Sequence, residues 1–160
     1  MTDSIGPAPT SPAGPYLLAA LLCDRILVEK DGSKSLIRQI DKLTQTAMGT
    51  DPPEEMEPFT HTVSMYVCLR RGDQGGKHQL GVTIVGPSGS RTTILATPID
   101  FEGVPGSGID LTAELPVRIE KPGAYWFEVA LNASIITRVP LRVNYERVVR
   151  PAAAPEAPER

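Results

Sequence analysis

The sequence has little of what marks a specialised class of protein. Of 160 residues, only two are cysteines, which excludes a disulfide-rich scaffold. A formal net charge of −3 at pH 7 argues against nucleic-acid binding, which uses a strongly basic surface. No apolar run approaches the roughly 20 residues that a membrane-spanning helix needs. We therefore expect neither a nucleic-acid partner nor a membrane span.

The apolar stretch that ends at Cys23 is similar to the end of a lipoprotein signal, but it lacks a basic start. No Lys or Arg precedes it, and Leu22 stands where processing prefers a small side chain. The sequence therefore predicts a cytoplasmic protein in which Cys23 and Cys68 stay reduced.

Proline is abundant and gathers at the two ends of the chain, in residues 1–15 and 151–160. Because proline fixes φ and lacks a backbone N–H, these segments are poor partners for a sheet, and we predict two disordered tails. The remaining residues, 16–150, form one predicted domain. A domain of this length buries roughly two thirds of its unfolded surface, which is enough for a core.

The predicted domain alternates apolar and polar residues with a period of two, which is typical of half-buried antiparallel strands. Gly- and Pro-containing turns separate the alternating runs. We predict eight strands, at residues 16–29, 35–46, 61–70, 78–86, 91–97, 111–120, 123–131 and 135–145. This pattern predicts an all-β fold, a single antiparallel β-sandwich with Greek-key-like connections. Segment 35–46 also fits a helical spacing.

The register of the last two predicted strands follows from their hydrophobic pattern. A two-residue turn would place Phe127 opposite Arg138 and put a charge on the apolar face. A three-residue loop at 132–134 places Phe127 opposite Val139 and Trp126 opposite Pro140, on the outer face. A slip of one residue exchanges the two faces of a strand, so the pattern predicts the second register.

Five short segments carry a resemblance to a known family. They are Leu-Leu-Cys-Asp at 21–24, Gly-Lys-His-Gln-Leu-Gly-Val at 76–82, Pro-Ser-Gly at 87–89, Pro-Gly-Ala-Tyr at 122–125 and Pro-Leu-Arg-Val at 140–143. Together they resemble an uncharacterised family of small bacterial β-sandwich proteins, over residue 16 to about residue 143. The resemblance implies an immunoglobulin-like or C2-like fold and carries over no activity and no catalytic residue.

The possible metal ligands are spaced unfavourably. The soft ligands are Cys23, His61, Cys68 and His78, without the close pairs of a zinc site. The loop carboxylates Asp73, Asp100, Glu102 and Asp110 are scattered, but a C2-like module that binds calcium or another ligand stays open as an alternative function. No Gly-x-Ser-x-Gly motif is present. The sequence predicts no catalysis, no metal and no cofactor.

Asp24 shares the parity of the apolar residues Leu22 and Ile26, which predicts an inward carboxylate. A buried carboxylate needs hydrogen-bond partners. We therefore predict a structural role for Asp24, in which it binds loop amides, and a β-bulge that turns it outward is the alternative.

Trp126 is the only tryptophan, and the predicted register places it on the outer face. Aromatic and arginine side chains often anchor protein interfaces. The predicted interface comprises Trp126, Arg138, Pro140, Arg142 and, with the two sheets stacked, Tyr66. Packing of Trp126 under a tail or against Pro140 is the alternative. The sequence thus predicts a non-catalytic interaction or scaffold module that binds a protein partner or a second copy of itself.

Overall fold

The computed structural model describes residues 12–151, which form nine strands and no helix. The strands are β1 (Tyr16–Val28), β2 (Lys34–Gln39), β3 (Lys42–Gly49), β4 (Phe59–Arg70), β5 (Gly76–Val85), β6 (Arg91–Phe101), β7 (Gly108–Ile119), β8 (Gly123–Leu131) and β9 (Ser134–Val149). The all-β prediction is confirmed. A search of the described residues for a helix that could cross a membrane finds none.

The predicted tails lie mostly outside the described residues, which begin at Pro12 and end at Pro151. The first described residues contact the loop between β4 and β5. The carbonyl oxygens of Pro12 and Ala13 accept hydrogen bonds from the amides of Asp73 and Gln74, each at 3.0 Å. Residues 12 and 13 are therefore tied to the folded domain.

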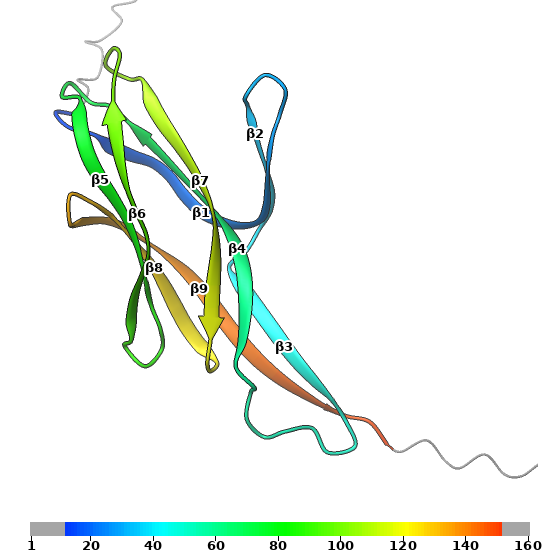
Figure 1. Ribbon diagram of the computed structural model, residues 1–160. Helices are drawn as coiled ribbons and strands as arrows, with labels where there is room; N and C mark the ends of the chain where they lie inside the picture. The colour runs from blue at the N-terminus through cyan, green and yellow to red at the C-terminus, as the bar shows by residue number, and fades with distance from the viewer. Residues whose placement is uncertain (1–11, 152–160) are drawn as a thin grey trace, which may run out of the picture.

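The strands form two sheets (Figure 1). One has four strands in the order β2-β1-β4-β7, and the other has five in the order β3-β9-β8-β5-β6. Neighbouring strands are antiparallel, except that β3 and β9 run parallel. The second sheet is therefore mixed, which corrects the prediction of a wholly antiparallel fold. A parallel neighbour far away in the sequence leaves no local signal, because no tight turn joins the two strands.

Both sheets contribute alternate side chains to one hydrophobic core. Met65 and Val67 of β4 and Phe127 and Val129 of β8 have no solvent exposure at all. Leu80 and Val82 of β5 and Leu141 and Val143 of β9 belong to the same cluster. Alternation works here because successive side chains of a strand point to opposite faces, so one face of each sheet can be wholly apolar.

The predicted strand at 35–46 is two strands, β2 and β3, that belong to different sheets. Between them Ile40 is buried and its amide donates to the carbonyl of Leu22, at 2.9 Å. Just before this crossing Arg38 has a φ of 52°. The physical reason for the break is a change of hydrophobic phase, since Ile37 and Ile40 cannot share one face of a continuous strand. The same irregular spacing of apolar residues is the reason that segment 35–46 also fits a helical pattern.

The end of β1 and the whole of β2 form a two-stranded hairpin that projects from the body of the molecule (Figure 1). The pairing of β1 with β4 ends at Cys23, so the following residues pair with β2 alone. Asp24 is therefore exposed, and it forms an ion pair with Arg38 at 2.8 Å. The prediction of an inward Asp24 is wrong, because no second sheet faces the chain at this point.

The predicted register of β8 and β9 is confirmed over most of its length. Phe127 lies opposite Val139 in the core, and Trp126 lies opposite Pro140 on the outer face. The hydrophobic pattern selects this register because a slip of one residue would bury Trp126 and expose Phe127.

The turn between β8 and β9 differs from the predicted three-residue loop at 132–134. It consists of Asn132 and Ala133, whose φ angles are 50° and 66°. Two successive residues with positive φ make the type I′ turn that suits the twist of a hairpin. An irregularity between Val129 and Ala130 absorbs the extra residue and restores the confirmed register.

Candidate functional site

Trp126 lies on the outer face of the five-stranded sheet with 40% of its surface exposed. Its neighbours along β8, Tyr125 and Phe127, both point into the core. On either side of it lie Pro140 of β9 and Val85 of β5. A large aromatic side chain is thus held by a fixed backbone and still has an accessible face.

A buried carboxylate lies next to Trp126 on the same face. Glu128 is only 6% exposed, although it points away from the core. Two arginines cover it: Arg138 Nε donates to Oε1 at 2.9 Å, and Arg91 Nη2 donates to Oε2. These hydrogen bonds, from Arg91 first and then Arg138, hold the pKa of Glu128 below its usual value. We call Trp126, Glu128, Arg91, Arg138 and Pro140 the Trp126 surface.

The two arginines remain about half exposed, with 54% of the Arg91 side chain and 56% of the Arg138 side chain accessible. A guanidinium group has five N–H donors, and Glu128 accepts only part of this set. The remaining donors are held in place beside Trp126. The charges of the three groups sum to one positive unit, so the surface favours an anionic group of a partner.

The lowered pKa of Glu128 predicts a pH-dependent contribution to stability. The carboxylate stabilises the fold fully above its unfolded pKa, and this contribution disappears as the pH falls through the lower folded pKa. We expect Glu128→Gln to be less stable than wild type at neutral pH, with a gap that narrows in acid. Thermal unfolding of both proteins between about pH 3 and pH 8 tests this. A gap that is constant or widens in acid would contradict it.

The other residues of the predicted interface are only partly brought together. Arg142 lies on the same face as Pro140, next to Lys42 of β3 and opposite Ala124. Tyr66 lies on β4 in the other sheet, between two residues, Met65 and Val67, that point into the core.

The prediction that Tyr66 lies beside Trp126 is wrong, because the two side chains point away from the core on opposite sides of the molecule. Both residues alternate with core residues, but the alternation specifies a face and not a sheet. Burial, more than its neighbour Cys68, raises the pKa of Tyr66 to about 12.

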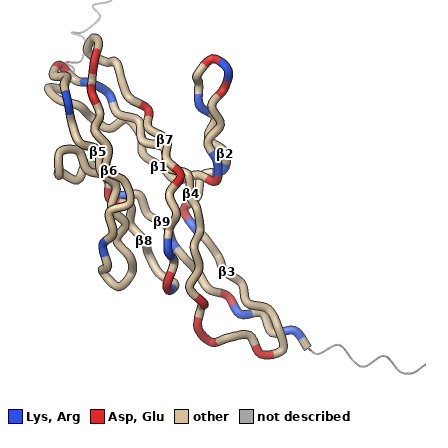
Figure 2. Tube along the Cα trace, viewed as in Figure 1, with Lys and Arg blue, Asp and Glu red and all other residues tan. Residues whose placement is uncertain are grey.

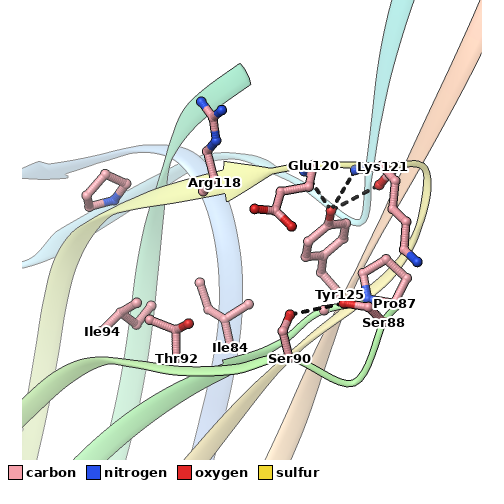
Figure 3. A pocket seen from close by; sticks show the side chains of 12 residues that line it. Ile84, Pro87, Ser88, Ser90, Thr92, Ile94, Arg118, Glu120, Lys121 and Tyr125 are labelled. Atoms are coloured by element: carbon pink, nitrogen blue, oxygen red, sulfur yellow. Dashed lines mark hydrogen bonds between the residues drawn. The ribbon is translucent and has the colours of Figure 1, made fainter. Parts of the chain in front are cut away.

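A pocket of about 240 Å³ lies at the end of the molecule where the β5–β6 turn approaches the end of β7 (Figure 3). Its apolar lining includes Ile84, Ile94 and the ring of Tyr125. Hydroxyl groups and charged side chains line its walls; they belong to Ser88, Ser90, Thr92, Arg118, Glu120 and Lys121.

Sequence reasoning missed this pocket. Residues 86–90 were interpreted as a hairpin turn, which they are, with the Gly86 amide donating to the Ser90 carbonyl at 2.9 Å. The three hydroxyl residues at 88, 90 and 92 were the one available signal. They become a wall of a pocket only because β7 of the other sheet ends beside them.

The residues considered as metal ligands do not converge. Within residues 12–151, no three His, Cys, Asp or Glu side chains are placed to hold a metal ion. Asp110 pairs with Arg70 at 3.2 Å and with Lys34 at 3.8 Å. Cys23 and Cys68 are buried free thiols, and burial raises the pKa of both.

Comparison with known proteins identifies a family match. Residues 18–144 match the model of a family of unknown function (DUF6941). No curated protein matches the chain.

Solved structures give a more distant likeness. An alkylpurine DNA glycosylase of Pseudomonas fluorescens (AlkC), bound to DNA containing an abasic site analog, aligns with a TM-score of 0.50 and 10% identity, over 84% of this chain and 31% of that one. A β-glucosidase of Listeria innocua in complex with glucose has a TM-score of 0.45 and 12% identity, over 83% of this chain and 17% of that one. β-Glucosidase 3B of Thermotoga neapolitana, in complex with α-D-glucose, has a TM-score of 0.44 and 16% identity, over 81% of this chain and 16% of that one. The chain thus spans less than a third of each protein, and the likeness to the glycosylase concerns the fold alone.

Proposed function

The chain belongs to a family of unknown function (DUF6941), and from that premise, which brings no activity with it, we propose that the protein is a non-catalytic protein-interaction module. The Trp126 surface is its contact site. One observation carries the proposal: a half-exposed tryptophan lies beside two arginines that a single buried carboxylate holds in place.

The chemistry of the Trp126 surface suits recognition of an acidic segment of a protein. Tryptophan and arginine are enriched among the residues that dominate binding energies at interfaces. Arg91 and Arg138 are already fixed by Glu128, so a partner does not have to order both side chains on binding. A partner with a carboxylate next to an apolar residue would match the free N–H donors and the exposed ring of Trp126.

Self-association is a second way to use this surface. The loop between β3 and β4 carries acidic residues, which Figure 2 shows gathered along that segment. It contains Asp51, Glu54, Glu55 and Glu57. Arg147 holds the loop, donating to the Pro52 carbonyl through Nη2 at 2.7 Å. An acidic loop of one copy against the Trp126 surface of another would be electrostatically favourable.

We also propose a more specific type for the all-β fold. One core shared by two sheets and repeated crossings of the chain between them support a β-sandwich with Greek-key-like connections, immunoglobulin-like or C2-like in type. Action in the bacterial cytoplasm stays a prediction from the sequence. The calcium-binding alternative gains no support from the described residues, since Asp110 is already paired with two cations.

Trp126→Ala is expected to weaken binding of the partner protein at least about fivefold, because truncation of a central tryptophan typically costs more than about 1 kcal/mol of binding energy. The full chain is used for an affinity pull-down from native lysate, followed by calorimetry with the purified partner. Val104→Ala is the control, since Val104 is 72% exposed and lies in the β6–β7 loop.

Equal affinities for wild type, Trp126→Ala and Val104→Ala would remove the Trp126 surface as the contact site. If the captured protein is the chain itself, sedimentation decides whether Trp126→Ala shifts the assembly toward monomer. A self-complex that Trp126→Ala leaves intact would contradict the proposal as well.

A further inference from the structure

The pocket described above is built from the free edges of the two sheets. Strand β6 is an edge of the five-stranded sheet, and β7 is an edge of the four-stranded sheet. Each edge contains a proline, Pro98 in β6 and Pro116 in β7, and proline cannot donate to a ladder. The two edges are therefore poor sites for an added strand, and the pocket suits a side chain or a small molecule better than an extended backbone.

The polar groups of the pocket have distinct directions (Figure 3). The carboxylate of Glu120 points toward the hollow, whereas the guanidinium group of Arg118 leads away from it. Lys121 runs past Pro87 at the rim. Among the ion pairs of the described residues, none involves Glu120. Arg118 and Lys121 also line the pocket, but their charged ends are directed away from the hollow, so the charge that faces it is negative.

The wall opposite Glu120 offers hydrogen-bond acceptors. Ser90 and Thr92 present hydroxyl groups across the hollow from the carboxylate (Figure 3). The apolar side chains of Ile84 and Ile94 lie beside Thr92 on the same wall, where Ile84 pairs with Thr92 across β5 and β6. The ring of Tyr125 closes the end next to Glu120. One end of the pocket thus suits a cation and the rest suits an apolar stem.

The backbone at the Glu120 end of the pocket is held in place before any ligand binds. The hydroxyl of Tyr125 accepts hydrogen bonds from the amides of Glu120 and Lys121, at 3.1 and 3.4 Å, and donates to the Lys121 carbonyl at 3.0 Å. A site that is ordered in advance loses less entropy on binding.

We infer that this pocket binds an alkyl cation, which is an ammonium or guanidinium group on an apolar stem. The cation would pair with Glu120 and donate to Ser90 and Thr92, and the stem would lie on Ile84 and Ile94. A volume of about 240 Å³ is below the roughly 300 Å³ at which drug-sized sites begin, and it suits one long side chain or a small amine. A lysine or arginine of a partner and a free amine share this chemistry.

The test uses the full chain labelled with ¹⁵N and follows its amide signals during titration. The cationic probes are pentylamine and Nα-acetylarginine amide, and pentanoate and pentanol are the matched anionic and neutral probes. We expect both cations to shift the amides of Gly86, Ser90 and Thr92 in a saturable way. Pentanoate and pentanol are expected to bind at least about tenfold more weakly, because they lack the charge that pairs with Glu120.

Two variants separate charge from shape. Glu120→Gln is expected to weaken cation binding at least about tenfold. Glu114→Gln is the matched control, since Glu114 is an exposed carboxylate of β7, like Glu120 just after the strand, and lies outside this pocket. Gly86→Ala is expected to block the pocket, because a Cβ there would lie 2.8 Å from Ser90 Oγ and 3.7 Å from the Tyr125 ring.

The outcomes decide whether the pocket binds a cation and whether that cation is a side chain of a partner or a free amine. Tighter binding of Nα-acetylarginine amide than of pentylamine supports a side chain within a polypeptide, and the reverse supports a free amine. The inference is overturned if pentanoate binds as well as the cations, or if Glu120→Gln and Glu114→Gln behave alike. Absence of any shift up to about 20 mM cation would overturn it too.

Discussion

Replacing Phe127 with alanine is expected to lower the free energy of unfolding by about 3–5 kcal/mol, which is the usual cost of deleting a buried aromatic ring. Phe127 has no solvent exposure and belongs to the core that both sheets share. Most single domains are stable by only about 5–15 kcal/mol, so the loss is a large part of the total. Urea unfolding followed by far-UV circular dichroism measures it.

The neighbouring Trp126 is the control for Phe127, because the two adjacent side chains point to opposite faces of β8. Trp126→Ala is expected to cost less folding stability than Phe127→Ala, since 40% of the Trp126 surface is already exposed to solvent whereas Phe127 is fully buried. If Phe127→Ala does not fold, Phe127→Leu retains most of the buried volume and is expected to cost about 1.5 kcal/mol or less. Equal losses at positions 126 and 127 would contradict the observed register.

The sequence was sufficient to predict which side chains of β4 and β8 face the core, because that information is local. The apolar face of β4 and the pairing of Phe127 with Val139 both follow from alternation with a period of two. Turn chemistry was less informative. Ala133 adopts a positive φ that alanine rarely takes, so the sequence pattern did not indicate the type I′ turn.

What could not be predicted depends on contacts between distant parts of the chain. The parallel pairing of β3 with β9 joins residues about a hundred positions apart, and nothing in 42–49 alone indicates the partner. The same limit explains Tyr66 and Trp126, since alternation places both on outer faces without saying which sheet each belongs to. The pocket beside Glu120 exists only because the edges of two sheets meet.

The Trp126 surface was predicted only in part for a related reason. Trp126, Arg138 and Pro140 were found through the hairpin register, which is a local relation. Arg91 was missed, because its side chain reaches Glu128 from β6 across the intervening strand β5. The buried carboxylate that organises the surface therefore became visible only when the order of strands in the sheet was known.

Asn132→Ala is expected to destabilise the protein by about 2–3 kcal/mol, for two separable reasons. Asn132 has a φ of 50°, and an alanine forced into this left-handed region lowers the free energy of unfolding by roughly 1–2 kcal/mol. Its side chain also joins the turn to β5: Oδ1 accepts from the amide of Gln79 at 2.9 Å, and Nδ2 lies 2.7 Å from Nδ1 of His78. Losing these hydrogen bonds is expected to cost about 1 kcal/mol more.

Asn132→Gly separates the two contributions, because glycine accepts a positive φ without strain and loses the same side-chain hydrogen bonds. The backbone amide of residue 132 still donates to the Gln79 carbonyl, at 2.9 Å in the native protein, and is unaffected by either substitution. Urea unfolding should therefore place Asn132→Gly between wild type and Asn132→Ala. Equal stability of the two variants would mean that the positive φ costs nothing, and a glycine variant as stable as wild type would mean that the bonds to β5 contribute nothing. If alanine proved no worse than asparagine, neither the type I′ turn nor its attachment to β5 would be needed to hold the β8–β9 register in which Trp126 faces outward.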